Sequence, residues 1–173
     1  MFEDSYKKAK KIEMDAERAF QRDERYRIGK LEEVRMFNYL TSIGYKVTDI
    51  SKERNEQNYW SPFDLLAESK YYSFFADVKY RSSRGGFPID TEKVDFWLSY
   101  ERPNTKVNDR IVIICTPGRQ DSFVSVADIQ DFYSIGRSLM IPRDGMRSII
   151  IIRKILEHCY RDDTSYSLAS YTD

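Results

Sequence analysis

The order of apolar and polar segments predicts an α/β (α+β) fold, in which helices flank a mixed central β-sheet. One observation is an amphipathic segment of helical periodicity, residues 30–43, followed by three short runs typical of strands. The other is a second helical segment, residues 91–100, which separates these runs from an apolar strand at 110–116. A chain of 173 residues can enclose one hydrophobic core, so we expect a single domain with small extensions.

Turn and cap residues set the bounds of the predicted elements. The first helix ends at Gly44, which suits the C′ position, and Asp90 is a favourable N-cap for the second helix. The remaining elements are expected in this order: a strand at 45–50, a polar loop at 51–61, a hairpin of 62–68 and 71–80 that turns at Ser69 and Lys70, a basic loop at 81–86, the buried strand at 110–116, and a strand or strand-to-helix step at 123–129.

The two ends of the chain are expected to extend a central core. Residues 1–28 read as a charged helical extension, with eight basic and seven acidic residues between Met1 and Arg27, which argues against a nucleic-acid-binding arm. Residues 29–147 form the core, and residues 148–173 a C-terminal segment and polar tail. The apolar run at 148–160 fits a helix or a strand.

The composition limits the classes of function. Lys+Arg and Asp+Glu both number 28, so attraction to nucleic acid requires a local basic patch. Cys115 and Cys159 lie in apolar segments without metal-binding spacing, and we expect two free thiols in a reducing compartment. The N-terminus lacks the apolar core of a signal peptide, and no run is long enough to span a bilayer. We therefore expect a soluble, cytoplasmic protein without membrane contact.

Several enzyme classes are excluded because the sequence lacks the residues that they require. His158 is the only histidine, which excludes histidine-based zinc hydrolases, and we expect it to be structural. A glycine-rich G-x-x-x-x-G-K-[ST] loop is missing from the sequence, which excludes a P-loop enzyme. Cysteine catalysis would require His158 beside Cys115 or Cys159, and adjacent residues of one element point apart.

Glu33 occupies an unusual position in the first helix. On a helical wheel of about 100° per residue it falls within the apolar arc, between Leu40 and Phe37, whereas Glu32 falls at its edge. The arc is formed by Leu31, Val34, Met36, Phe37, Leu40 and Ile43. A carboxylate in a core-facing stripe requires a partner, usually a cation. The alternative is a first-turn glutamate favoured by the helix dipole.

The hairpin places charges among apolar residues. Asp77 and Lys79 share a face with Phe75, and a two-residue turn would pair Asp64 with Phe75 and make it a diagonal neighbour of Asp77. Neighbouring carboxylates repel unless a cation lies between them. Mg²⁺ suits one or two carboxylates, water and a phosphate oxygen, with the carbonyl of Val78 as a further ligand. The alternative is a plain Asp–Lys ion pair on a solvent-facing strand.

These residues carry a resemblance to a known family. Pro62, Phe63 and Asp64, followed by Asp77-Val78-Lys79, resemble the motif of the PD-(D/E)XK nuclease superfamily, with one residue inserted after the proline. The spacing from Gly29 to Glu33 resembles the G-x-x-x-E helix of archaeal Holliday-junction resolvases. The resemblance covers residues 29–129 and implies a restriction-endonuclease-like core. It also implies an endonuclease that hydrolyses phosphodiester bonds with Mg²⁺, for which Mn²⁺ would substitute.

The resemblance assigns a role to each motif residue. Glu33, Asp64 and Asp77 would hold the metal together with the carbonyl of Val78. Lys79 would orient or deprotonate the attacking water and touch the phosphate. Because the ion both activates water and stabilises the transition state, each carboxylate is expected to be essential.

The expected substrate is DNA, by family analogy alone, cleaved at a specific site or a specific structure. Lys93 or Thr91 is the polar residue expected from the following helix. Arg81 and Arg84 are expected to contact backbone phosphates, with a solvated loop as the alternative. Trp60 is expected to stack on an unpaired base or wedge a duplex, with core packing as the alternative.

A second function stays open on the sequence alone: a catalytically inactive nuclease-like module for nucleic-acid binding or assembly. Retention of all four motif residues favours the enzyme, whereas the zero net charge leans towards the module. A homodimer or higher homo-oligomer is a further expectation, with the N-terminal helix or the C-terminal apolar segment as the interface.

Overall fold

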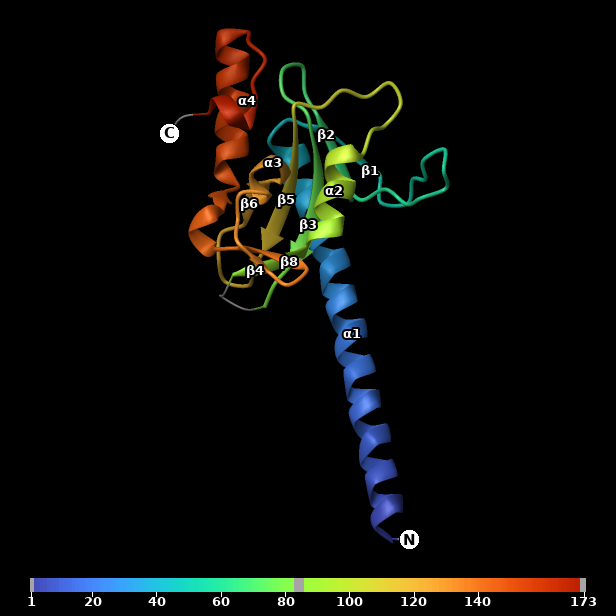
Figure 1. Cartoon of the computed structure of the whole chain (residues 1–173). Helices are drawn as coiled ribbons and strands as arrows, with labels where there is room; N and C mark the ends of the chain where they lie inside the picture. The colour runs from blue at the N-terminus through green and yellow to red at the C-terminus, as the bar shows by residue number, and fades with distance from the viewer. Residues whose placement is uncertain (1, 83–85, 172–173) are drawn as a thin grey trace.

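A computed structural model describes residues 2–82 and 86–171, with residues 2–10, 12 and 13 described by their backbone alone. Its centre is a six-stranded mixed sheet (Figure 1). The spatial order is β1 (Lys46–Asp49), β2 (Leu65–Glu68), β3 (Phe74–Tyr80), β5 (Asp109–Cys115), β6 (Ser122–Ser125) and β9 (Arg147–Ser148). Strands β3 and β5 pair in parallel and the other neighbours are antiparallel, which confirms the predicted mixed sheet.

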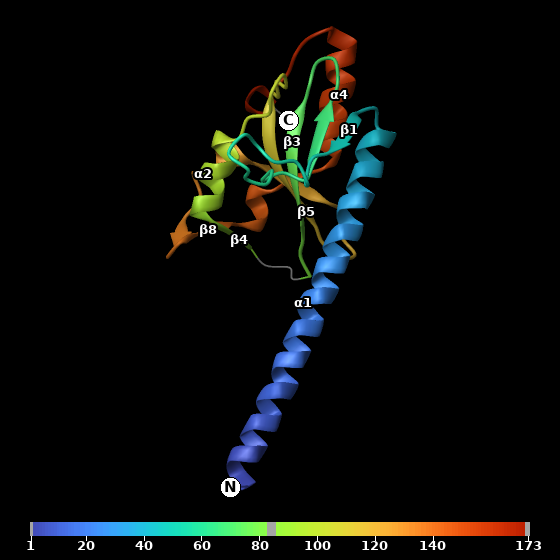
Figure 2. The same ribbon diagram turned by 90° about the vertical axis from the view of Figure 1, so that its right-hand side faces the viewer.

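Helices cover both faces of this sheet (Figure 2). On one face, α1 (Phe2–Ser42) and α4 (Ile150–Asp162) pack on alternate residues of β3 and β5. On the other face lie α2 (Thr91–Ser99) and α3 (Val126–Ile129). The ambiguous run at 148–160 is thus helical from Ile150 onwards, because its apolar residues recur at helical spacing and bury one stripe: Ile152, Ile155, Leu156 and Cys159.

A second, three-stranded sheet was not predicted. It joins β4 (Phe87–Asp90), β8 (Ser138–Ile141) and β7 (Ser134–Ile135) in antiparallel register. These strands are short, and β4 contains Pro88, which weakens a strand signal in the sequence. Two 3-10 turns, η1 (Arg143–Gly145) and η2 (Leu168–Ser170), complete the described elements.

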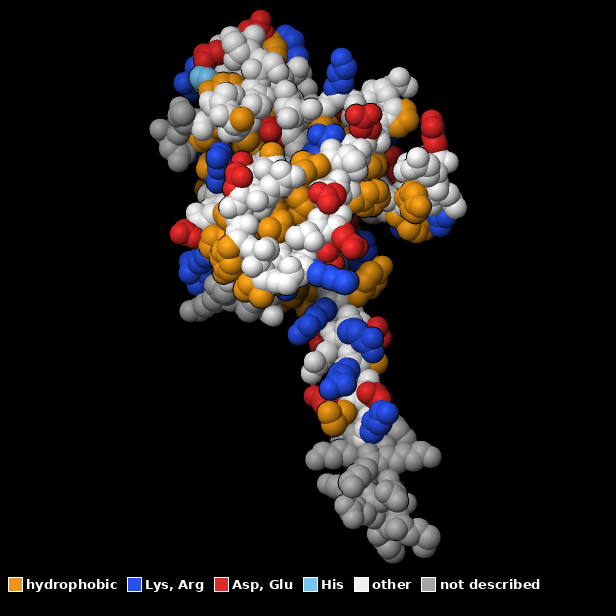
Figure 3. All heavy atoms as spheres, in the orientation of Figure 1, with side chains coloured by type: hydrophobic (Ala, Val, Ile, Leu, Met, Phe, Trp, Pro, Cys, Tyr) orange, Lys and Arg blue, Asp and Glu red, His pale blue; other side chains and the backbone are white. Residues whose placement is uncertain are grey.

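Helix α1 runs without a break through the boundary expected after residue 28. At about 1.5 Å per residue it is about 60 Å long, and its N-terminal part projects away from the body (Figures 1 and 2). On the face shown in Figure 3, basic and acidic side chains alternate along the described part of this projection. The mixed charge agrees with the solvated helix expected from the sequence.

The apolar arc predicted for α1 was too wide. Met36 and Leu40 are fully buried, whereas Leu31 and Val34 are 57% and 58% exposed. The reason is that the helix passes the edge of the sheet and buries only the side that faces β3 and β1. The predicted caps are confirmed: Gly44 has a φ of +112°, and the Asp90 carboxylate accepts a hydrogen bond from the N–H of Glu92.

The predicted register of the hairpin was wrong by two residues. Strands β2 and β3 pair Leu66 with Phe75 and Leu65 with Ala76, and the Asp64 N–H donates to the Ala76 carbonyl, so Asp64 lies beside Ala76 and not opposite Phe75. The turn is longer than two residues because the Ser69 hydroxyl donates to the carbonyl of Tyr72 and accepts from its N–H. A shift of two residues leaves each side chain on its predicted face.

Two further expectations concern the whole chain. Cys115 and Cys159 are buried free thiols, as predicted. Among the described helices, none has both the length and the apolarity required to cross a bilayer.

Candidate active site

Asp64 is held in place by its main chain and by the residue before it. Its N–H donates to the carbonyl of Ala76 and its carbonyl accepts from the N–H of Ile50, each at 2.9 Å. Phe63 is buried and stacks on Phe75 at a centroid distance of 5.3 Å. The Asp64 side chain therefore leaves a fixed backbone at the start of β2.

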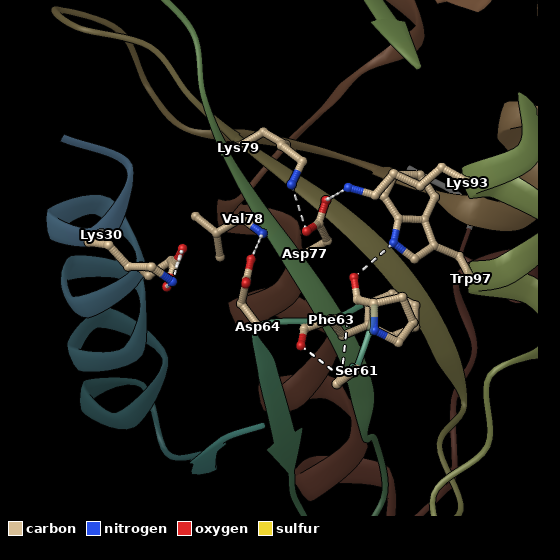
Figure 4. A network of polar contacts seen from close by, with 11 residues as sticks. Lys30, Ser61, Phe63, Asp64, Asp77, Val78, Lys79, Lys93 and Trp97 are labelled. Atoms are coloured by element: carbon tan, nitrogen blue, oxygen red, sulfur yellow. Dashed lines mark hydrogen bonds and ion pairs between the residues drawn. The ribbon is translucent and has the colours of Figure 1, made fainter. Parts of the chain in front are cut away.

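The motif residues are also tied to helix α2. The indole Nε1 of Trp97 donates to the carbonyl of Pro62 at 3.0 Å, and the hydroxyl of Ser61 donates to the carbonyl of Phe63 at 2.8 Å (Figure 4). Trp97 is fully buried, so the proline turn and α2 form one rigid unit. This contact places Lys93, one helical turn before Trp97, beside the strand residues.

Asp77 lies in the interior of β3 and is 3% exposed. The Nζ of Lys79 donates to its Oδ1 at 2.7 Å, and the Nζ of Lys93 lies 3.8 Å from its Oδ2 (Figure 4). Within the described residues, this buried Oδ2 has no hydrogen-bond partner. A buried carboxylate oxygen without a hydrogen bond carries a desolvation cost that a cation would offset.

The two aspartates are close enough to affect each other. Oδ2 of Asp64 accepts a hydrogen bond from the main-chain N–H of Val78 at 2.8 Å. Burial, followed by the charge of Asp77, raises the pKa of Asp64 to about 6, against the effects of Val78 and Lys79. Both aspartates line one open cavity of about 600 Å³. Two repelling carboxylates and a free oxygen suit a divalent cation.

The two lysines of the cavity differ in their electrostatics. Burial opposes the charge of Lys79, but the Asp77 carboxylate outweighs it and raises the pKa of Lys79. Burial lowers the pKa of Lys93, and the neighbouring Lys79 adds to this effect, against the attraction of Asp77. Thr91 does not line this cavity, and its hydroxyl donates to the carbonyl of Arg137, so of the two residues expected from α2 it is Lys93 that reaches the cavity.

Glu33 is paired with a cation of its own helix. The Nζ of Lys30 donates to both carboxylate oxygens of Glu33, at 2.7 and 3.0 Å. Burial raises the pKa of Glu33 against the effect of Lys30, and the charge of Asp64 contributes, so the two carboxylates sense each other. Glu33 does not line the aspartate cavity, and among the described residues Glu33, Asp64 and Asp77 do not place three ligand atoms all within 4.8 Å of one another.

The position of Glu33 in α1 excludes the alternative that it is a first-turn glutamate favoured by the helix dipole. Helix α1 begins at Phe2, so Glu33 is far from its first turn and the helix dipole does not account for it. The predicted requirement for a cationic partner is met by Lys30.

Comparison with solved structures identifies the architecture. Hjc, a Holliday junction resolvase from Archaeoglobus fulgidus, matches with a TM-score of 0.55 at 15% identity, over 73% of this chain and 95% of that chain. This chain has a restriction-endonuclease-like fold. D212, a nuclease from a fusselovirus, matches with a TM-score of 0.47 at 14% identity, over 84% and 96% of the two chains. Neither a protein-family model nor a curated protein matches the sequence.

A second cluster of acidic side chains lies outside the aspartate cavity. Ligand atoms of Glu32, Cys115 and Asp121 lie within 4.8 Å of one another. Arg35 already supplies the cation: its guanidinium binds both oxygens of Asp121, at 2.7 and 2.8 Å, and one oxygen of Glu32 at 2.7 Å. Burial raises the pKa of the Cys115 thiol, which opposes the thiolate that a metal would require. This group ties α1 to the turn before β6.

Basic residues continue from the aspartate cavity along one side of the fold. Lys79 is shared with a second cavity, which Arg25 and Arg81 also line. Arg81 is shared with a third cavity of about 330 Å³, which Arg143 and Arg147 line. In the described part of the chain, Arg81, Arg143 and Arg147 form no ion pair within 4 Å.

The sequence indicated only part of this basic path. Arg81 was predicted to contact phosphates because it follows Asp77 and Lys79 closely in the sequence. Arg84, predicted for the same role, lies outside the described residues. The sequence did not indicate Arg25, Arg143 and Arg147, because they come from distant segments that only the fold brings together.

Trp60 is exposed to 53% and lines the aspartate cavity together with Phe96 of α2. The alternative of core packing for Trp60 is therefore wrong. Phe96 was not predicted, because its place beside the cavity depends on how α2 docks.

Proposed function

We propose that this protein is a Mg²⁺-dependent endonuclease that hydrolyses phosphodiester bonds in DNA. The observation that carries the proposal is the buried pair of Asp64 and Asp77 beside Lys79, with one Asp77 oxygen free of hydrogen bonds. Asp64, Asp77 and the carbonyl of Val78 would hold the metal. When bound, Mg²⁺ lowers the pKa of its water and offsets the charge that develops on the phosphate.

The chain's own groups have separate tasks. The N–H of Val78 holds one oxygen of Asp64 and leaves the other free to bind. Lys79 has a raised pKa and keeps its charge at neutral pH, so it orients the water and neutralises the phosphate instead of taking a proton. Lys93 lies on the other side of Asp77 and supplies a second cation for the substrate phosphate.

We assign Glu33 as the third carboxylate of the site. Its charge already interacts with that of Asp64, and its ion pair with Lys30 is partly exposed, chiefly on the Lys30 side, and can open. Opening of this pair would let Glu33 turn towards the metal, while Lys30 moves to solvent.

The DNA backbone would follow the basic path from Lys79 through Arg81 to Arg143 and Arg147. Arginines without carboxylate partners are available to phosphates, and each phosphate contact releases counterions. Such a path supplies the local attraction that the zero net charge of the chain does not.

Cleavage of end-labelled DNA and RNA with Mg²⁺, compared with EDTA, tests the proposal. Asp77→Asn should reduce cleavage by several orders of magnitude, because it removes a metal ligand. Asp95→Asn, an exposed change on α2, is the matched control and should cleave like wild type. Cleavage that survives Asp77→Asn would place the activity elsewhere, and tight binding without cleavage by wild type would favour the inactive binding module.

Two expectations from the sequence stay predictions. Sedimentation of the purified chain checks the homo-oligomer, and cell fractionation checks the cytoplasmic location.

A further inference from the structure

Two aromatic side chains form the rim of the cavity that contains Asp64 and Asp77. Trp60 comes from the loop before β2 and Phe96 from α2, and they are 53% and 38% exposed. Their neighbours Phe63 and Trp97 are buried, at 1% and 0% exposure, so the hydrophobic core nearby is already filled. Large aromatic faces left exposed at a polar cavity indicate a binding surface.

The Trp60 side of the rim is rigid. Trp60 forms an isolated β-bridge with Arg54, whose guanidinium lies 4.0 Å from the centroid of the indole ring. The Asn55 N–H donates to the carbonyl of Tyr59, and the Asn55 side chain accepts from the Tyr59 N–H, both at 2.9 Å. The loop projects from the body (Figure 1), and the Arg54 guanidinium over one face of the ring holds the indole in its orientation. A ring that is ordered before binding loses little entropy when a ligand stacks on it.

Charges of both signs line the cavity. Asp90 and Glu92, near the start of α2, repel a phosphate backbone, whereas Lys93 of the same helix lies 3.8 Å from Oδ2 of Asp77, next to the proposed metal site. Lys79 lies on the side that continues to Arg81, where phosphates are attracted. A nucleotide whose phosphate lies at Asp64 and Asp77 therefore runs its backbone over Lys79 and turns its base towards the aromatic rim.

We infer that the rim of Trp60 and Phe96 binds an unpaired nucleobase next to the scissile phosphate. The substrate class is then single-stranded DNA, or a duplex with an unpaired segment, rather than continuous duplex. In a duplex the base faces are stacked on one another, whereas an unpaired base can stack on an aromatic ring. This inference rests on the proposed nuclease function for the position of the scissile phosphate.

Intrinsic fluorescence tests the inference without cleavage. The chain has two tryptophans, and Trp97 is fully buried with its Nε1 bonded to Pro62, so quenching by a bound base reports on Trp60. Wild-type protein in EDTA is titrated with a thymidine 12-mer and with a blunt-ended, fully paired duplex of 12 base pairs. The single strand should quench the emission and the duplex should not. The quenching should be lost in Trp60→Phe, which keeps only Trp97.

Affinity gives a second measurement. Trp60→Ala and Phe96→Ala should each weaken binding of the 12-mer about tenfold, within the range expected for one base–aromatic stack. Tyr133→Ala, which changes an aromatic residue of 60% exposure outside the cavity, should not change it. Equal quenching by duplex and single strand, or unchanged affinity in Trp60→Ala, overturns the inference.

Cleavage separates this inference from the proposed function. With Mg²⁺, a single strand should be cut faster than the duplex by wild type, and Trp60→Ala should remove the difference. Cleavage of both by wild type, unchanged in Trp60→Ala, rejects the rim and leaves the nuclease standing. Quenching by the 12-mer without any cleavage keeps the stacked base and rejects the nuclease, together with the assignment of a scissile phosphate.

Discussion

The carboxylate of Asp64 accepts a hydrogen bond from the main-chain N–H of Val78, the residue between Asp77 and Lys79. This 2.8 Å bond fixes the first motif aspartate against the strand that carries the second. The two negative charges are thus held together by the fold, and burial together with the charge of Asp77 raises the pKa of Asp64 to about 6. Because the two charges repel each other, we expect the stability of the protein to depend on pH and on bound cations.

We expect Asp64→Asn to stabilise the metal-free protein at neutral pH. The folded state binds the Asp64 proton more tightly than the unfolded chain does, because the pKa is raised from 3.8 to about 6. The stability of wild type therefore falls as pH rises between these values, and the loss persists above pH 6. Asparagine avoids this loss and still accepts the Val78 bond, so the gain is on the order of 1–3 kcal/mol at pH 8 and disappears below about pH 4.

Urea unfolding in EDTA between about pH 4 and pH 8 measures this difference. Asp95→Asn, exposed on α2, removes one charge without a buried partner and should follow wild type. Equal unfolding free energies for wild type and Asp64→Asn at pH 8 would show that Asp64 is solvated.

We expect Mg²⁺ to raise the melting temperature of wild type at about pH 8, because a ligand that binds only the folded state stabilises it. The shift should be smaller near pH 5, where the proton on Asp64 competes with the metal. Asp77→Asn should abolish the shift, since it removes the free oxygen Oδ2. A thermal-shift titration gives the result, and a full shift in Asp77→Asn would move the metal to another group, such as Glu32 and Asp121.

Whether a feature of this site could be predicted depends on how far apart in the sequence its interacting residues are. Asp64, Asp77 and Lys79 lie on adjacent strands of one hairpin, so alternation along the strands was enough to bring them together, even with the register two residues out. The pairing of Glu33 with Lys30 is also local, but the helical wheel could not show it, because Leu31 and Val34 look like core residues and are exposed. Residues from distant segments, such as Phe96 and Arg143, had no local signal at all.

The same distinction holds for the fold. Five of the six strands of the central sheet and both caps follow from periodicity and turn chemistry within short windows, whereas the edge strand β9 was not predicted. In the small sheet, β4 pairs with β8 about 50 residues further along the chain, and its short strands carry little propensity of their own.

Lys79→Met should destabilise the protein by about 1–3 kcal/mol, because it leaves the buried Asp77 carboxylate without its closest cation. The double variant Asp77→Asn with Lys79→Met should recover most of this loss, since neither member of the Asp77–Lys79 ion pair then stays charged without the other. Chemical unfolding of the two single variants and the double variant gives the coupling free energy. Additive effects would mean that the 2.7 Å contact between Lys79 and Asp77 contributes nothing in solution.

Lys30→Met should strengthen Mg²⁺ binding several-fold while Glu33→Gln weakens it. Removing Lys30 leaves the Glu33 charge without its partner and near Asp64, which makes the site more negative. Arg153→Met is the matched control, because it removes a comparable ion pair, with Glu157 on α4, outside the aspartate cavity. Calorimetric titration measures the affinities, and weaker binding in Lys30→Met would assign Glu33 a purely structural role.

Arg81→Ala and Arg143→Ala should each weaken binding of a labelled DNA strand in EDTA, and each should lower the slope of log affinity against log salt by about 1. The reason is that both guanidinium groups line the cavity that follows Lys79 and Arg81 along the basic path, and they have no carboxylate partner within 4 Å in the described residues. Arg161→Ala, an exposed change in the last turn of α4, removes the same charge and should leave the slope unchanged. If all three variants lower the slope equally, DNA does not follow the path from Lys79 to Arg143, and binding reflects net charge alone.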